Sequence, residues 1–279
     1  MSNIDVKRTA KLFIGGAFPR SESGRTYEAK DKNKNFVANV ALASRKDGRD
    51  AVVAARAAFA KWSEATAYKR AQVLYRVSEI MQGRREQFVE ELSLWSKTKK
   101  QAENEVDEAI NRMVWFAGWA DKIAMVTGSN NPVAGPFFDF SIPEPTGVVA
   151  AVAPEDSALL GLVETIASIV VSGNTVIVIA SESQPLPAVS LAEVIATSDV
   201  PGGVVNILTG KTSELLPWIG SHMEIDGIDV AGLNKKQEDE VKLVGADNLK
   251  RISRFAPANH PERILSFMEH KTIWHPIGI

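Results

Sequence analysis

The sequence predicts the α/β fold class, with a parallel sheet of four or five strands covered by helices. Between residues 147 and 255, short apolar segments alternate with helical patterns, and the apolar segments are hydrophobic throughout rather than at every second position. Strands of that kind are typical of a parallel sheet buried between two helical layers. The alternation therefore indicates a Rossmann-like unit, which we place at residues 147–258.

Ahead of this unit, residues 1–125 predict short strands followed by a helical region. The segment 12–28 breaks apolar pieces with Gly, Pro and Ser, as short strands and turns do. Apolar residues then recur at helical spacing in three stretches, at 47–63, 68–96 and about 101–125. Asp47 is the expected cap of the first helix. We expect Trp95, Trp115 and Trp119 to anchor the core rather than to form a binding box.

The arm at 126–146 and the tail at 259–279 differ in character from the rest. The arm carries several prolines around FFDFSI, which predicts an extended arm or hairpin. Between arm and tail, the alternating pattern places strands near 147–154, 175–180, 202–210 and 225–232, with helices near 159–173, 187–198, 212–222 and 236–248. The tail holds one more candidate strand and no further strand–helix pair.

Composition excludes several kinds of function. The formal net charge of -2 predicts no attraction to nucleic acid, and no apolar run is long enough to cross a bilayer. The N-terminus lacks an apolar signal core, so we expect a cytoplasmic protein with no membrane partner. There is no cysteine, so a thiolate nucleophile is excluded. His270 and His275 are five residues apart, on opposite faces of a strand, so we expect no metal site there.

The motifs that could carry chemistry are few. No GxGxxG follows any strand, and the turn at 209–213 fails the Walker A spacing because Val205 occupies the position of the first glycine. We interpret that turn as a strand-to-helix connection in which Thr209 or Thr212 caps the helix, with a phosphate-binding switch as the alternative. Glu155 and Asp156 follow the first strand of the unit, where acid–base groups can lie.

Taken together, these segments resemble the NAD(P)-dependent aldehyde dehydrogenase superfamily from about Leu12 to Phe255. The segments that carry the resemblance are LFIGGAF, SGRTYEAKD, AVVAARAAFAKWSEATAYKRAQVLYRVSEIM, NEVDEAINRMVWFAGWADK, PTGVVAAVAP, SGNTVIVI, PGGVVNILTG and IDGIDVAG. The resemblance implies a Rossmann-like unit that binds a nicotinamide nucleotide in the family. It also implies a small β flap through which members assemble.

The departures from the family pattern fall on its functional positions. Where the family has Trp-Asn after the first strand, this chain has Glu155 and Asp156, and an ionised aspartate cannot donate to an oxyanion. The ribose-binding lysine is replaced by Ile179, and the serine that supports the pyrophosphate is replaced by Leu233. The general-base glutamate of Leu-Glu-Leu-Gly-Gly aligns with Phe255, in the stretch Arg254 to Ala258.

The part of the family's chain that bears the cysteine nucleophile has no counterpart after Phe255. The tail ILSFMEHKTIWHPIGI instead resembles the family's C-terminal segment, which pairs with the arm to form the oligomerisation flap. The resemblance thus implies a catalytic domain that is absent and assembly parts that are kept. This plan is similar to the shortened second (C-terminal) module of family-16-type aldehyde dehydrogenases.

Two functions remain open from the sequence. The first is a pseudoenzyme without catalytic residues, a structural or regulatory subunit that assembles with itself or with an active aldehyde dehydrogenase. The second is a protein that retains weak NAD(P) binding, with Glu182 as the surviving cofactor-binding residue; otherwise we expect no cofactor. Assembly would use the flap segments 133–143 and 264–277. Their apolar side chains, which we expect a monomer to expose in part, are Phe137, Phe138, Phe140, Ile264, Phe267, Ile273 and Trp274.

Overall fold

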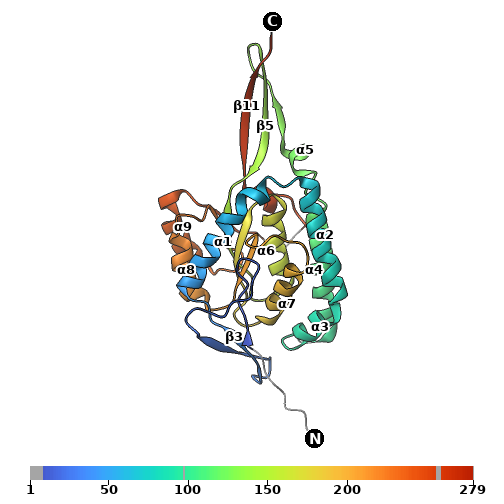
Figure 1. The fold of residues 1–279 in the computed structure, drawn as a ribbon, viewed down its shortest axis with the longest axis vertical. Coiled ribbons are helices and arrows are strands. Elements are labelled where there is room, and N and C mark those ends of the chain that lie inside the picture. The colour runs from blue at the N-terminus through green and yellow to red at the C-terminus, as the bar shows by residue number, and fades with distance from the viewer. Residues whose placement is uncertain (1–8, 97, 256–258, 279) are drawn as a thin grey trace.

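The computed structural model describes residues 9–96, 98–255 and 259–278 (Figure 1). These residues form a central parallel sheet between helices, a small N-terminal sheet and a β flap that stands out from the body. The expected end of the Rossmann-like unit at 256–258 and the N-terminal residues 1–8 lie outside the described residues.

The central sheet confirms the predicted fold class. Its five strands are β6 (Val148–Val152), β7 (Thr175–Ile179), β8 (Val205–Leu208), β9 (Gly227–Asp229) and β10 (Arg251–Ser253). They lie in the order β10-β9-β6-β7-β8, and every neighbouring pair is parallel. Because consecutive strands cross over through helices, the carboxyl ends of all five strands meet at one edge of the sheet.

Helices cover both faces of this sheet, and the alternation of side chains along β7 shows how. Val176 and Val178 join the core formed with α2 (Ala67–Gly83), α4 (Lys99–Ala117), α6 (Leu160–Val171) and α7 (Leu186–Ala196). Ile177 and Ile179 point the other way, into the core formed with α1 (Arg45–Ser63), α8 (Thr212–Ser221) and α9 (Lys235–Gly245). A strand buried on both sides must be apolar throughout, which is the pattern that the sequence carries.

The N-terminal region departs from the expected elements in its boundaries. The first helix is capped by Ser44, not Asp47; Asp47 is instead the third helical residue and completes a capping box with Ser44. The stretch 68–96 is not one helix, because it breaks at Arg84 into α2 and α3 (Arg85–Ser93). The stretch 101–125 is likewise divided between α4 and the short α5 (Ile123–Thr127).

A small sheet with the order β1-β3-β2 packs against α7 through Leu186 and Val189. Its strands are β1 (Thr9–Ala10), β2 (Thr26–Lys30) and β3 (Phe36–Ala41). The tryptophan that anchors the core is Trp62, which is buried and donates its indole N–H to the carbonyl of Val170 at 2.9 Å. Trp115 and Trp119 are partly buried against the same core, and Trp95 is half-buried, so the expected anchors are peripheral.

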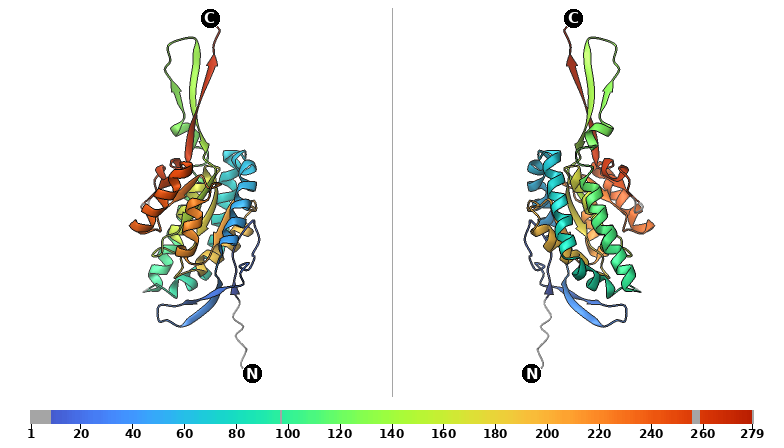
Figure 2. Two further views of the ribbon diagram at one scale, coloured as in Figure 1. Left: turned by 90° about the vertical axis from the view of Figure 1, so that its left-hand side faces the viewer. Right: turned by 90° about the vertical axis from the view of Figure 1, so that its right-hand side faces the viewer.

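The flap joins the arm and the tail in one antiparallel sheet, with the order β11-β5-β4. Its strands are β4 (Ser129–Asn131), β5 (Phe137–Pro145) and β11 (Met268–Pro276), and β11 pairs with β5 along their whole length. The flap stands beyond the end of the body in both side views (Figure 2). The predicted pairing of arm and tail is therefore confirmed.

The beginning of the tail does not belong to this flap. The short helix α10 (Glu262–Leu265) lies against α6, and Ile264 and Phe267 are fully buried. The ring of Phe267 lies so close to Gly227 of β9 that a Cβ on that glycine would be 2.9 Å from it. The expectation that Ile264 and Phe267 form part of an exposed flap surface is therefore wrong, because they complete the core beside the central sheet.

Candidate functional site

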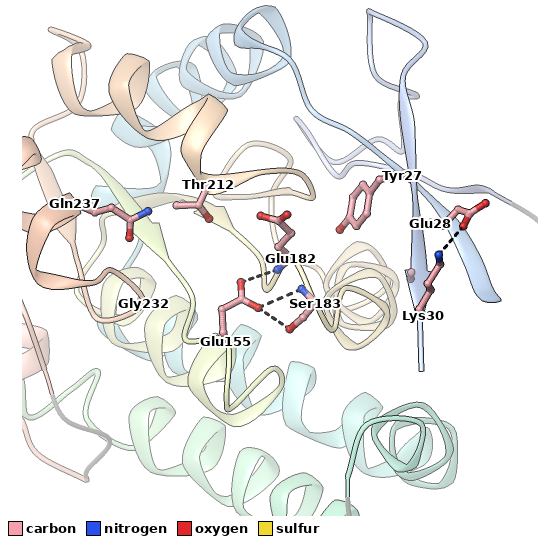
Figure 3. A pocket seen from close by; sticks show the side chains of 10 residues that line it. Tyr27, Glu28, Lys30, Glu155, Glu182, Ser183, Thr212, Gly232 and Gln237 are labelled. Carbon is pink, nitrogen blue, oxygen red and sulfur yellow. Dashed lines mark hydrogen bonds and ion pairs between the residues drawn. The ribbon is translucent and has the colours of Figure 1, made fainter. Parts of the chain in front are cut away.

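A cleft of about 550 Å³ opens at the carboxyl edge of the central sheet, where ligands bind in open α/β sheets. Its walls come from the loops after β6, β7, β8 and β9, and from β2 of the small sheet (Figure 3). The residues that line it are Tyr27, Glu28, Ala29, Lys30, Glu155, Glu182, Ser183, Thr212, Gly232 and Gln237. Sequence reasoning had singled out Glu155, Glu182 and Thr212 from this set, and the structure brings these three together.

Glu182, the residue expected to remain from a cofactor site, lies three residues beyond β7 and extends into the cleft (Figure 3). Its backbone amide donates to Glu155 at 2.7 Å. Among the described residues, none donates a hydrogen bond to its carboxylate. Glu182 is therefore an available acceptor in the cleft.

Glu155 plays a part that the sequence did not predict. It accepts hydrogen bonds from the hydroxyls of Ser181 and Ser183, both at 2.7 Å, and from the amides of Glu182 and Ser183, at 2.7 and 3.2 Å. Partial burial opposes the charge of this carboxylate, but these bonds favour it more, and they hold the pKa of Glu155 below its usual value. Glu155 is thus an ionised group that is hydrogen-bonded to the neighbouring loop. It is therefore a poor general base, and it is poorly suited to acid–base catalysis together with Asp156.

Tyr27 brings an unpaired hydroxyl to the cleft from β2. The ring points toward Glu182 and Ser183 (Figure 3), and the buried hydroxyl has no hydrogen-bond partner among the described residues. Burial, followed by the negative charges of Glu182 and Glu155, raises the pKa of Tyr27 above its usual value. The cleft therefore carries a negative potential. Sequence reasoning missed Tyr27, because nothing in the chain order places β2 beside the loop after β7.

At two helix N-termini on this edge, side chains of the protein accept hydrogen bonds from the first backbone amides. Glu105 of α4 accepts from the amides of Leu159 and Leu160 at the start of α6, at 3.0 and 3.2 Å. Asn234 and Gln237 form a capping box at the start of α9. The first amides of a helix are the donors that bind a phosphate. At α6 and α9 those donors already have partners.

The turn at 209–213 corrects an expectation. Helix α8 begins at Thr212 after Lys211, and no side chain caps it. Thr209 donates its hydroxyl to the carbonyl of Ala41 at 2.7 Å, and it is buried. Neither Thr209 nor Thr212 is therefore the cap. Thr209 instead holds the end of β8 to the end of β3.

The residues that stand at the family's functional positions have different roles in this structure. Asp156 is exposed, and Leu233 is buried in the core beneath α9. Phe255 packs against Phe267, with their ring centroids 6.4 Å apart, and against the guanidinium of Arg263 at 5.6 Å. Phe255 is thus a packing residue, and the aligned positions 256–258 lie outside the described residues. No cluster of metal-ligating side chains occurs within the described ranges.

A second group of charges lies buried near the same edge. Arg263 of α10 donates to Asp229 at the end of β9 at 2.8 Å, to the hydroxyl of Thr165 at 2.7 Å, and to Glu164 of α6 at 3.3 Å. Arg112 of α4 pairs with the other oxygen of Glu164. Arg263, Glu164 and Asp229 are all less than 5% exposed as side chains. Because each charge has an opposite partner, this group holds α4, α6, α10 and β9 together. None of its charged side chains is left to bind a substrate or an ion.

Comparison with known proteins agrees with this architecture. A model described as "Aldehyde dehydrogenase family" matches residues 18–266. "Aldehyde dehydrogenase, cytosolic 1" of Elephantulus edwardii is 30% identical over 267 residues, which cover 94% of this chain and 52% of that protein. "Cytosolic 10-formyltetrahydrofolate dehydrogenase" of Pongo abelii is 30% identical over 260 residues, covering 88% of this chain and 28% of that protein.

Solved structures give the same result. The NAD+ complex of aldehyde dehydrogenase from Bacillus cereus superposes with a TM-score of 0.84 at 25% identity, over 91% of this chain and 53% of that one. The chain spans about half the length of the cytosolic aldehyde dehydrogenase that it matches. Because the matching model covers most of the chain, and the fold superposes on 91% of it, the chain belongs to the aldehyde dehydrogenase family.

Proposed function

We propose that this chain acts as a pseudoenzyme of the aldehyde dehydrogenase family, a structural or regulatory subunit that assembles through its flap. The observation that carries the proposal is the exposed apolar surface of the flap. Phe137 is 38% exposed, Phe138 45%, Trp274 58% and Ile277 49%. Such a group of large apolar side chains on a projecting sheet is typical of an interaction surface.

The chemistry of the chain supports the same proposal. Acyl transfer through a thiohemiacetal needs a thiolate, and this sequence contains no cysteine. Asp156 cannot stabilise an oxyanion, and Phe255 offers no base. We propose no catalytic role for any residue of the chain.

Assembly can be tested by light scattering after size exclusion. We expect the chain to elute as an oligomer, alone or with a co-expressed full-length aldehyde dehydrogenase. Replacing Phe138 and Trp274 together by serine should weaken this association at least about tenfold, because it removes two exposed aromatic anchors.

The matched control is Tyr68→Ser, because Tyr68 is 70% exposed on α2 of the body. It should leave the association unchanged. A chain that stays monomeric at all concentrations, and that ignores a full-length aldehyde dehydrogenase, would contradict the proposal. Equal loss of association in the control would place the interface elsewhere.

A second candidate is weak NAD(P) binding, favoured by the free carboxylate of Glu182 in the cleft of about 550 Å³. Calorimetric titration with NAD and NADP tests it. Tight stoichiometric binding, lost in Glu182→Gln, would favour this candidate over an assembly role alone. We expect no saturation, because the cleft has a negative potential and a pyrophosphate is an anion.

We further propose a cytoplasmic location with no nucleic-acid or membrane partner. The relative from Elephantulus edwardii carries "cytosolic" in its name. No helix within the described ranges is both long and apolar enough to span a bilayer. Fractionation of cells that express the tagged chain tests the location.

A further inference from the structure

The loop from Ser181 to Gln184 directs several hydrogen-bond donors at one point. The amides of Glu182 and Ser183 and the hydroxyls of Ser181 and Ser183 all donate to one carboxylate, at 2.7 to 3.2 Å. Successive amides that converge in this way form a concavity that binds anions. Bonds to an ionised acceptor are roughly twice as strong as bonds between neutral groups. The loop thus has the donor set of a built anion site.

The anion that occupies this site belongs to the chain itself. Glu155 comes from the loop after β6, 26 residues before Ser181, so no local turn forces the contact. Gln184 adds a bond from its side-chain amide to the backbone carbonyl of Glu155 at 3.2 Å, which holds the two loops together. Glu155 and Ser183 are exposed residues, and both line the cleft together with Glu182, so an external anion has a path to these donors.

The remaining charges of the cleft do not favour a second anion beside Glu155. Glu182 has no cationic partner among the described residues, and the one lysine in the lining, Lys30, pairs with Glu28 at 3.3 Å. Like charges in a partly enclosed cleft repel more strongly than they do in bulk water. The charge of Glu155 therefore decides whether the donors of the loop are open to an outside anion.

We propose that residues 181–183 form an oxyanion site of the phosphate class, which Glu155 keeps closed as an internal substitute for the ligand. In the unaltered chain, the cleft consequently rejects phosphate-bearing molecules. Without the Glu155 carboxylate, four donors lose their acceptor, and an inorganic phosphate ion takes its place. None of the residues of this site lies in β4, β5 or β11, so the site is independent of assembly through the flap.

The test compares thermal unfolding of the full chain in phosphate and in chloride of equal ionic strength. In chloride, Glu155→Ala should unfold at a lower temperature than the unaltered chain, because its donors are unpaired. Phosphate should restore the midpoint of this variant, and equilibrium dialysis should give it a phosphate affinity at least about tenfold above that of the unaltered chain. Adding Ser183→Ala to Glu155→Ala should reduce the restoration.

Asp156→Ala is the matched control, because it removes an exposed carboxylate from the same loop without touching residues 181–183. Phosphate also stabilises folded proteins generally, so the control and the unaltered chain define that baseline. Equal phosphate responses in all three proteins would overturn the proposal. If Glu155→Ala does not fold, Glu155→Ser serves instead, because its short side chain also withdraws the acceptor from the four donors. Its phosphate response must still exceed the baseline, and a response equal to the baseline overturns the proposal as well.

Discussion

Arg263 shows how a single residue can fix the position of a distant segment. Its guanidinium bonds to Asp229, Thr165 and Glu164, and so ties the tail to β9 and α6 at once. A buried charge with several partners contributes little net stability, but its removal leaves the other charges uncompensated. The fit of the tail to the body therefore depends on this side chain more than on any exposed ion pair.

Replacing Arg263 by methionine should lower the free energy of unfolding by about 3–5 kcal/mol, because Asp229 would remain buried without a cation. Urea denaturation measures the change. Arg251→Met is the control, because the pair of Arg251 with Glu269 is exposed and should contribute less than about 1 kcal/mol. Equal losses of unfolding free energy in the two variants would show that the buried Arg263 contributes no more to stability than an exposed arginine.

Sequence reasoning identified some residues of the cleft and not others, for a physical reason. Glu182 and Glu155 follow strands of a recognisable pattern, and the ends of parallel strands converge. Tyr27 joins the cleft only through the packing of β2 beside the loop after β7. The expectation for Ile264 and Phe267 is wrong because strand pairing in the flap says nothing about where the tail first meets the core.

At the scale of elements, the hydrophobic period predicted the helices and the strands β6 to β9 of the Rossmann-like unit, but neither the edge strand β10 nor every boundary. Strands β6 and β7 lie within the expected ranges because both of their faces are buried. The break at Arg84 carries no proline and follows Gly83, and it lets α3 pack on α7 through a bond from Gln87 to Ser190 at 2.9 Å. Gly83, a poor helix former, lies at the break, and tertiary contact holds α3 against α7.

The start of α1 gives a prediction at this scale. Ser44 is the cap, but Asp47 accepts from the amides of Ser44 and Glu22 and from the hydroxyl of Ser21, at 2.7 to 2.9 Å, and it is 4% exposed. We expect Asp47→Ala to cost about 2 kcal/mol or more, because three donors lose their acceptor. Ser44→Ala should cost about 1 kcal/mol.

Chemical denaturation of both variants beside Asp50→Ala tests this order. Asp50 lies on the same helix, and its exposed pair with Arg49 should be worth less than about 0.5 kcal/mol. If Ser44→Ala costs more than Asp47→Ala, the capping serine is the main link, and the bonds from Asp47 to the preceding loop matter less than we infer.

At the scale of the whole molecule, the tail has two separable parts. Its first part, through Phe267, completes the core: Phe267 is fully buried, and its carbonyl accepts from the side chain of Asn174 at 2.7 Å and from the amide of Thr146 at 3.1 Å. Its second part, β11, pairs with β5 of the flap and is largely exposed. Folding of the body should therefore depend on the first part, and the flap surface on the second.

Two truncations of the chain separate these roles. A chain that ends at Phe255 loses Arg263, Ile264 and Phe267, and we expect its unfolding free energy to fall by more than about 5 kcal/mol, which is comparable to the whole stability of many domains. A chain that ends at Glu269 keeps all three, so its thermal midpoint and its resistance to protease in the body should stay near those of the full chain, while its association through the flap is lost. Light scattering and thermal unfolding measured on the same samples distinguish the two effects. If the shorter chain is as stable as the longer one, the buried part of the tail is not a component of the core, and the division of the tail at Phe267 is wrong.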